Sequence, residues 1–543
     1  MPITSTILDV AGNNPEQLAL VGADERLTYS ELVDDSRRMF AVVDELHRAQ
    51  ADSPMPAPET DGIPITAISI TSAFHTSRII AGLAGYRTVS ATIDPRWPLT
   101  HQVDVIRATG IGVIISDSPT LAEALASSSW TGTVISLADF RAREAARTHE
   151  AALTHETAAT HQTAPSHGTA SIHETASTHE TVAAGESPAS PTPAPAVRDA
   201  SEPFLMLFSS GTTSNPKAFI KTRQQYRDNV AVSSAHLEPL PGVATLAPGP
   251  VSYSLTLYAV IESLATGGSV HVADEFDPIT MGRRIESEAI SRVVAVPAVV
   301  RALAEAARRD PERFTHLDLV VTGGANLPAS IRDRLAEILP ETRLISYYGA
   351  AEIGFIGDSR DGDGTWITVY PTIGAQIRDE SGAEVPEGEL GTLWIRAAAC
   401  SYGYVTDTTD AVLRGADGWA TVDDQGRIEN GRLQLAGRAG DIAITGGHKV
   451  SLPEVERAFE TYDNLGEVCA IALEDPALGS LIALVIEVSA DKTALLKHAR
   501  ARLAPQFVPR RVYRLQHLPR TVGGKIRRVE TVDLIMDGQG QRL

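Results

Sequence analysis

The sequence predicts an α/β protein whose parallel sheets are covered by helices, followed by a small β subdomain and a C-terminal α+β domain. Short apolar runs with the length of buried strands occur at Ile65 to Ile70, Val113 to Ser116, Val293 to Val296 and Leu317 to Thr322. The last two are each followed by a helical stretch, at 298–308 and 328–338. This alternation is typical of parallel sheets with helices on both faces.

The pattern of apolar segments and turn residues changes toward the C-terminus. Between residues 365 and 435, short strand-like segments are separated by Gly and Asp, which predicts a small β subdomain. Beyond Gly437 we expect a helix at 453–462, strands at 467–473 and 482–488, and a helix at 492–502. We therefore predict an N-terminal domain of residues 1–437 and a C-terminal domain of residues 438–543, with the boundary near Arg438 to Asp441.

Composition narrows the class of protein. A chain of 543 residues that is 43% hydrophobic can bury more than one core. It contains no apolar run of about 18 residues, so no integral membrane segment is expected. The N-terminus lacks the pattern of a signal peptide, which favours the cytoplasm. The net charge of −21 argues against a nucleic-acid partner, and two cysteines, Cys400 and Cys469, are too few for a disulfide framework.

One segment differs from the rest of the chain. From His149 to His179 a histidine recurs every six residues, and a Ser-, Pro- and Ala-rich stretch follows. Scarce large apolar residues cannot offset the entropy of ordering, so we expect a disordered insertion over residues 146–200. A metal-binding tract is the alternative, although a step of six residues would not place successive histidines on one face of a helix.

A hydroxyl-rich, glycine-containing loop follows the apolar run 204–208. Its residues are Ser209, Ser210, Gly211, Thr212 and Thr213, and it ends in Lys217. Glycine lets backbone N–H groups turn toward an anion, the hydroxyls donate hydrogen bonds, and the lysine supplies positive charge. The loop therefore predicts a phosphate-binding site, although its spacing is not that of a Walker motif and a polar surface turn is the alternative.

Further motifs follow in a fixed order, at residues 347–352, 418–423, 437–441, 445–450 and 519–528, with two early segments at 27–32 and 91–95. Together with the phosphate loop they resemble the adenylate-forming superfamily, which includes acyl- and aryl-CoA synthetases, peptide-synthetase adenylation domains and luciferases. The resemblance covers nearly the whole chain. It implies ATP-dependent activation of a carboxylic acid as an acyl-adenylate, and a mobile C-terminal domain.

The resemblance implies a role for individual residues. Lys525 would bridge the substrate carboxylate and the α-phosphate, and Glu352 would bind Mg²⁺. Asp423 would bind the ribose hydroxyls, with its neighbour Asp424 as a possible substitute. The remaining nucleotide-binding residues would be the loop residues above together with Gly323, Gly324, Ala325, Tyr348, Gly349, Ala351 and Arg438.

The resemblance implies that the second half-reaction uses CoA. Gly440 corresponds to the hinge of the C-terminal domain, and Gly446, Gly447, His448 and Lys449 correspond to the loop beside the pantetheine passage. Tyr253 is expected in the acyl pocket, where a packing aromatic is the alternative. The expected cofactors are thus ATP, Mg²⁺ and CoA, and the expected substrate is a fatty or aromatic acid. Two alternatives remain: an enzyme that loads a separate carrier protein, and a catalytically silent nucleotide-binding protein.

Several positions depart from the family pattern. Ser214 and Ala218 stand where glycine is common, Ala351 replaces a threonine, and Val422 replaces the glycine before Asp423. Gly440 replaces the usual acidic or lysine hinge residue. None of these changes removes a charged catalytic group, so the resemblance implies a divergent member with slower adenylation.

Overall fold

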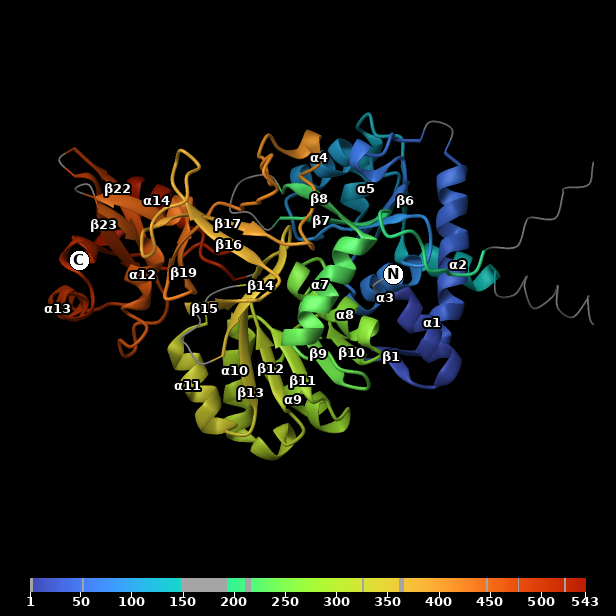
Figure 1. The fold of residues 1–543 in the computed structure, drawn as a ribbon, viewed down its shortest axis with the longest axis horizontal. Helices are drawn as coiled ribbons and strands as arrows, with labels where there is room; N and C mark the ends of the chain where they lie inside the picture. Colours follow the sequence, from blue (N-terminus) through green and yellow to red (C-terminus); the bar gives the residue numbers. More distant parts are fainter. Residues whose placement is uncertain are drawn as a thin grey trace, which may run out of the picture.

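The structure is a computed structural model that describes residues 3–50, 53–147, 193–209, 216–324, 327–360, 366–445, 448–476, 478–521 and 524–543. Its strands form three sheets, two in the large N-terminal part and one in the small C-terminal part (Figure 1). The predicted α/β class, with a large N-terminal domain and a small C-terminal domain, is confirmed. No helix in the described ranges is long and apolar enough to cross a membrane.

The first sheet has six strands in the order β6-β5-β3-β4-β7-β8, and all neighbours are parallel except β7 and β8. Its central strands are buried on both faces, as expected of parallel sheets covered by helices. The strands are β3 (Ile65–Ser69), β4 (Val89–Thr92), β5 (Val113–Ser116), β6 (Thr133–Ile135), β7 (Pro203–Phe208) and β8 (Ala218–Thr222). The helices between them are α3 (Ala73–Leu83), α4 (Leu99–Thr109) and α5 (Pro119–Ala126).

The second sheet has thirteen strands and combines a parallel half with an antiparallel half. The parallel half runs β1-β10-β9-β11-β12-β13, with β2 antiparallel at its edge. Its strands are β1 (Leu18–Val21), β2 (Arg26–Thr28), β9 (Ala244–Pro248), β10 (Ser269–Ala273), β11 (Arg292–Ala295), β12 (Leu319–Thr322) and β13 (Arg343–Ala350). The accompanying helices are α1 (Thr4–Asn13), α2 (Tyr29–Arg48), α7 (Arg223–His236), α8 (Ser254–Thr266), α9 (Pro278–Ser287), α10 (Pro297–Arg309) and α11 (Ala329–Ile338).

The antiparallel half corresponds to the predicted β subdomain. It contains β14 (Gly354–Ser359), β15 (Trp366–Val369), β16 (Gly374–Arg378), β17 (Gly391–Arg396), β18 (Asp424–Glu429) and β19 (Arg432–Arg438). These strands continue the parallel half through the pairs β13–β14, β14–β15 and β15–β19. The β subdomain is therefore an extension of the second sheet.

The C-terminal sheet contains β20 (Ile442–Thr445), β21 (His448–Ser451), β22 (Val468–Asp475), β23 (Gly479–Ile486), β24 (Arg511–Arg514) and β25 (Gln541–Arg542). Its helices are α12 (Leu452–Arg457), α13 (Lys492–Arg502) and α14 (Arg528–Met536). The helix expected at 453–462 ends earlier, because Tyr462 N–H bonds to Phe459 O at i−3, a tighter turn than the α-helix. Short 3₁₀ turns occur at Pro58–Thr60, Pro311–Phe314, Thr406–Thr408, Ala439–Asp441 and Pro505–Phe507.

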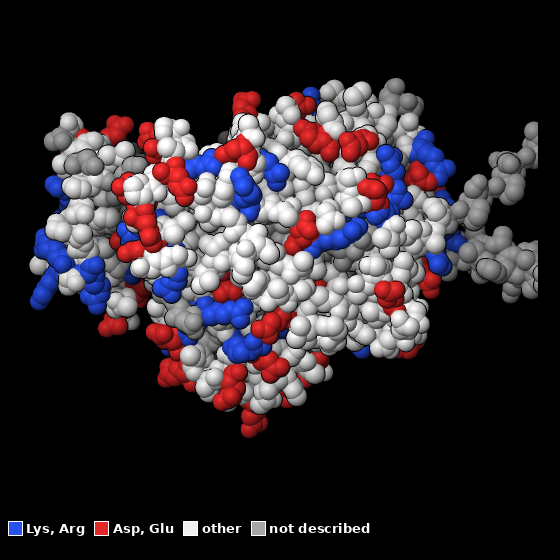
Figure 2. Space-filling model, viewed as in Figure 1, with Lys and Arg blue, Asp and Glu red and all other residues white. Residues whose placement is uncertain are grey.

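The face in Figure 2 carries acidic and basic side chains that are interspersed. Basic side chains gather at the left edge of this view, over the C-terminal part of the molecule. The net charge of −21 is therefore not spread as one continuous acidic field over this face.

The described residues reach into both ends of the segment expected to be a disordered insertion. Residues 137–147 are helical, and Pro195 is buried. The N–H of Ala196 donates to Gly85 O at 3.1 Å, and a side chain at Gly85 would collide with Pro195. The histidine repeat itself lies outside the described residues. The second boundary of the insertion therefore falls before Pro195 instead of at residue 200.

We predict that replacing residues 148–192 by a short Gly/Ser bridge leaves the melting temperature nearly unchanged, because the entropy of loop closure depends weakly on loop length. A longer deletion of residues 148–197 is the matched comparison, and it should lower the melting temperature because it removes Pro195 and Ala196. Calorimetry of both variants checks this expectation. An equal effect of the two deletions would contradict the boundary before Pro195.

Candidate active site

The ends of the predicted phosphate loop are held together at the edge of the first sheet. Ser209 N–H donates to Lys217 O at 2.9 Å, and Lys217 N–H donates to Ser209 Oγ at 3.3 Å. These bonds continue the antiparallel pairing of β7 with β8. The predicted loop residues Ser210, Gly211, Thr212 and Thr213, and also Ser214, lie outside the described residues. The structure therefore fixes the two ends of the loop, Ser209 and Lys217.

Glu352 lies in the turn between β13 and β14 and is buried, with only 6% of its surface exposed. Tyr404 connects this turn to the end of the phosphate loop. Its hydroxyl donates to Glu352 Oε1 at 3.1 Å, and the Lys217 ammonium lies 5.2 Å from the centre of its ring. The tertiary structure therefore places the predicted metal ligand next to the predicted phosphate-binding lysine. The sequence gives no signal for Tyr404, because no motif in its neighbourhood marks it.

A buried lysine lies beneath Glu352. Lys221, on β8, donates from Nζ to Glu352 O at 2.7 Å and to Ala399 O at 2.6 Å. Burial lowers the pKa of Lys221 to about 8. No sequence motif assigns a function to this lysine. Its position in the all-buried strand 218–222 was the available signal, since a lysine is rarely buried without a polar partner.

Tyr348, on β13, is linked to β18 through Asp424, although β14, β15 and β19 lie between these two strands in the sheet. Its hydroxyl donates to Asp424 Oδ2 at 2.6 Å. Arg438 forms an ion pair with Asp424 at 3.4 Å, and these two residues face each other across the β18–β19 pair. Burial raises the pKa of Asp424, while Arg438, Tyr348 and Lys525 act to lower it.

Lys525 therefore lies close enough to interact with Asp424, although it belongs to the C-terminal domain. Its side chain is accessible to solvent, yet the surrounding protein lowers its pKa, as does Arg438, while Asp424 raises it. Arg438 thus pairs with Asp424, and the charge of Lys525 acts on the same carboxylate from the other domain. An anion bound between the arginine and the lysine would find two cations already in place.

The two adjacent aspartates have different surroundings. Asp423 is exposed and has a φ of 64°, a left-handed conformation that is uncommon for a residue other than glycine. Its charge contributes to the raised pKa of Tyr404, the tyrosine that is bonded to Glu352. Asp424 is instead bonded to Tyr348 and Arg438. Asp423 thus has the more accessible carboxylate for a ribose.

The predicted Gly-Gly segment lies against an aromatic ring. A side chain at Gly323 would come within 2.4 Å of the ring of Tyr347, which makes glycine necessary here. Gly324 has a φ of 78°, and a side chain there would approach Leu255, in the first turn of α8. Ala325 lies outside the described residues. Gly349, by contrast, is close to backbone: a Cβ would lie 2.6 Å from Gly354 O.

Tyr253 precedes α8 and is half-buried. The Arg96 guanidinium lies 5.6 Å from the centre of its ring, and Arg96 is itself bonded to the buried Asp94. Burial and the nearby Asp94 raise the pKa of Tyr253 to about 12. Because α8 begins beside Gly324, Tyr253 lies in the same region as the Gly-Gly segment. Its raised pKa keeps the hydroxyl protonated at neutral pH.

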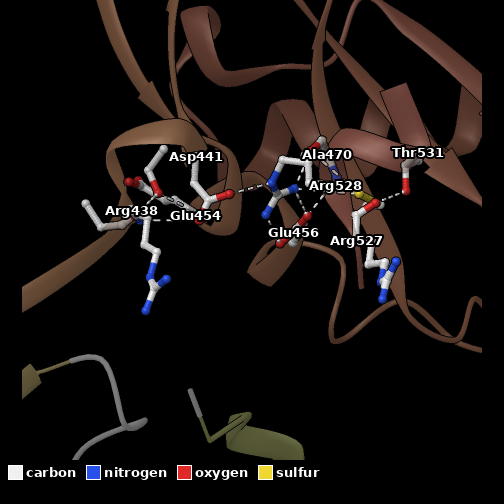
Figure 3. Close-up of polar contacts among 11 residues, drawn as sticks. Arg438, Asp441, Glu454, Glu456, Ala470, Arg527, Arg528 and Thr531 are labelled. Atoms are coloured by element: carbon white, nitrogen blue, oxygen red, sulfur yellow. Dashed lines mark hydrogen bonds and ion pairs between the residues drawn. The ribbon is translucent and has the colours of Figure 1, made fainter. Parts of the chain in front are cut away.

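The predicted hinge is joined to the C-terminal domain by one arginine, shown in Figure 3. Arg528 donates from Nε to Asp441 Oδ1 at 2.7 Å, and its Nη1 bonds to Glu456 and to Ala470 O. Asp441 also accepts a hydrogen bond from Arg438 N–H at 3.2 Å. Gly440 is exposed, and a side chain there would meet open space. Arg528 thus connects the hinge to α12 and to the loop that carries Lys525.

The predicted CoA segment belongs to the hairpin of β20 and β21. Thr445 pairs with His448, and Ile444 pairs with Lys449. His448 is exposed. Gly446, Gly447 and the side chain of Lys449 lie outside the described part of the structure. The segment remains a prediction for this reason.

Comparisons with known proteins identify related sequences and structures. The sequence model of the AMP-binding enzyme family matches residues 76–405, and that of the AMP-binding enzyme C-terminal domain matches residues 454–525. An uncharacterized acyl-CoA ligase of Bacillus subtilis is 27% identical over 349 residues, which are 63% of this chain and 70% of that protein. A salicylyl-CoA synthase / salicylate adenylyltransferase of a Streptomyces species is 29% identical over 357 residues, which are 62% of this chain and 64% of that protein.

A solved structure shows the same fold. ATP-bound MatB from Rhodopseudomonas palustris has a TM-score of 0.79 with this chain at 19% identity, and the match covers 99% of this chain and 100% of that one. The match extends over both domains.

We predict that Arg528→Met destabilises the C-terminal domain by about 3 kcal/mol, because Glu456 would be left without its cation in a largely buried position. Loss of the arginine should raise the pKa of Glu456 further above its unfolded value. The folded variant then binds a proton more readily than the unfolded chain, so the deficit is largest at neutral pH and shrinks as the pH falls. Calorimetry from pH 5 to pH 8 checks this, and a pH-independent deficit would contradict it.

Proposed function

Because the chain belongs to the AMP-binding enzyme family, we propose that the residues gathered around Glu352 and Asp424 activate a carboxylic acid with ATP. The predicted superfamily is confirmed, and so are the predicted activity, acyl-adenylate formation followed by transfer to CoA, and its class, an AMP-forming acid–thiol ligase. These rest on the family match and on the acyl-CoA ligases among the relatives. The assignment of single residues below is our proposal.

The convergence of Lys217, Tyr404 and Glu352 is the observation that carries the residue assignment. A carboxylate oxygen attacks the α-phosphorus of ATP, and pyrophosphate leaves. Negative charge accumulates on the departing phosphates, so cations held nearby stabilise the transition state. Lys217 and the loop that it ends would hold the β- and γ-phosphates. Asp423 would bind the ribose.

Glu352 fits the requirements of Mg²⁺. Among the described residues there is no group of three or more His, Cys, Asp or Glu side chains that could hold a metal by itself. Mg²⁺ needs no such group, since it commonly binds one or two carboxylates together with substrate phosphates and waters. Glu352 would be that carboxylate, held in place by Tyr404. When bound, the ion would neutralise charge on the leaving pyrophosphate.

Lys525 would bridge the acid and the α-phosphate. It is exposed, carries a flexible point charge, and lies near Asp424 and Arg438 at the domain junction. Two anions brought together there would repel each other, and the ammonium would offset this repulsion. Arg438 would add a second positive charge.

For the acid that is activated and transferred to CoA, we propose a fatty or aromatic acid. The hairpin of β20 and β21 would present Gly446 and Gly447 to the pantetheine arm, and the cytoplasm, predicted from the sequence, would supply ATP and CoA. An acid-dependent pyrophosphate-release screen with and without CoA tests the function. Acyl-AMP without thioester would support the carrier-loading enzyme, and ATP binding without pyrophosphate release from any acid would support a silent nucleotide-binding protein.

We predict that Lys525→Ala slows acyl-adenylate formation by about 100- to 1,000-fold, because one preorganised charge is lost from the site. Thioester formation from supplied acyl-AMP should be nearly unaffected. Lys497→Ala, a change of an exposed lysine on α13, is the matched control and should leave both half-reactions unchanged. Equal loss in the two half-reactions of the Lys525 variant would refute the assigned role.

We further predict that Gly447→Leu blocks thioester formation while acyl-AMP still accumulates, because a side chain there would occupy the space that the thiol arm needs. Single-turnover assays that separate acyl-AMP from acyl-CoA measure both steps. Unchanged thioester formation would show that Gly447 does not line the passage.

A further inference from the structure

The turn that carries Glu352 is held through its backbone and not only through its carboxylate. Glu352 O accepts hydrogen bonds from Lys221 Nζ at 2.7 Å and from Ser401 N–H at 2.8 Å. The neighbouring Ala351 O accepts one from the hydroxyl of Tyr258 at 2.7 Å. Two consecutive carbonyls of a three-residue turn are therefore fixed, and the direction of the Glu352 side chain depends on both.

Lys221 is the residue that joins this turn to other parts of the fold. It is 2% exposed and comes from β8, at the edge of the first sheet. Glu352 belongs to the second sheet, and Ala399, the other carbonyl bonded by Lys221, follows β17 in the β subdomain. One ammonium thus links three segments that are far apart in the sequence.

Lys221 is poorly explained by packing alone. Its strand is buried at all five positions, where an apolar side chain would fill the space without losing the hydration of a charge. In the described structure, both hydrogen-bond acceptors of its ammonium are backbone carbonyls. The capping box formed by Thr222 and Gln225 begins α7 directly after Lys221 and thereby fixes the position of its backbone.

We propose that Lys221 is a positioning residue for the active site, one that orients the carboxylate of Glu352 toward the metal–nucleotide complex by holding the backbone of its turn. This proposal rests on the role of Glu352 proposed above. Lys221 does not touch the substrate; it acts through Glu352 O, and Tyr258 acts in the same way through Ala351 O. The affinity for ATP in the presence of Mg²⁺ should depend on Lys221 far more than the affinity for metal-free ATP does.

The chain offers a close control two residues away. Arg223 is also fully buried and also donates to two backbone carbonyls, Ala84 O and Tyr86 O, both at 2.6 Å. Those carbonyls lie in the connection between α3 and β4, away from the Glu352 turn. Arg223 also pairs with Glu202 at 3.2 Å, and Arg223→Met removes this buried cation without touching the proposed site.

The experiment compares Lys221→Met, Lys221→Arg and Arg223→Met with the unaltered chain. Calorimetric titration gives the Kd of ATP with excess Mg²⁺ and with EDTA, and thermal melts give the stability. We expect Lys221→Met to weaken binding of ATP with Mg²⁺ by about 10- to 100-fold, the usual effect of losing a group that orients a metal ligand. The Kd in EDTA should change little, and Lys221→Arg should restore much of the lost affinity.

Arg223→Met should lower the melting temperature without a selective loss of the Mg²⁺-dependent affinity. The proposal is overturned if Lys221→Met binds ATP with Mg²⁺ as tightly as the unaltered chain, or if Arg223→Met produces the same selective loss. Because these titrations need no acid substrate, they remain decisive even if no acid supports pyrophosphate release, which would contradict the proposed function alone.

A second pair of variants applies if Lys221→Met does not fold. Tyr258→Phe removes only the hydroxyl bonded to Ala351 O. Tyr226→Phe is its control: the two rings pack edge to face at 5.4 Å, and among the described residues the Tyr226 hydroxyl has no hydrogen-bond partner. A selective loss of Mg²⁺-dependent affinity in Tyr258→Phe alone would support the backbone clamp, and identical behaviour of the two variants would overturn it.

Discussion

The buried ammonium of Lys221 is the interaction on which the arrangement of the active site depends. A charge that has left water must be compensated by hydrogen bonds, and here the acceptors are two carbonyls from separate segments. The turn of Glu352 and the segment after β17 can satisfy Lys221 only when both lie against β8. Lys221 therefore ties β8 of the first sheet to two segments of the second sheet at one point.

The segment after β17 is held from more than one side. Cys400 O accepts hydrogen bonds from Gln225 at 2.8 Å and from Arg414 at 2.9 Å, and Ser401 N–H bonds to Glu352 O. Tyr404 follows in the same segment and reaches both Lys217 and the carboxylate of Glu352. The site is thus supported by polar contacts between segments, and these contacts limit how far its charged groups can move apart.

The domain junction has a different character, because its contacts are charged and partly open to solvent. Asp424 is surrounded by Tyr348, Arg438 and, from the other domain, Lys525. Rotation of the C-terminal domain would withdraw only the lysine, since Tyr348 and Arg438 belong to the second sheet. Arg528 holds Asp441 at the start of the C-terminal domain, while a side chain at the neighbouring Gly440 would meet open space. The replacement of the family's threonine by Ala351 removes a hydroxyl beside Glu352, and the hydroxyl of Tyr404 is present there as a donor.

The amino-acid sequence by itself determined the class of fold and the motifs, because hydrophobic periodicity and glycine-rich turns are local properties. It predicted both the helix α13 and the strand β5 with the observed bounds. The tertiary structure alone decided which groups meet. Tyr404 and Lys221 gain their importance from residues 52 and 131 positions away, and nothing in the neighbouring sequence records such contacts. Likewise Asp423 and Asp424 are equivalent in the sequence, but the register of β18 against β19 pairs only Asp424 with Arg438.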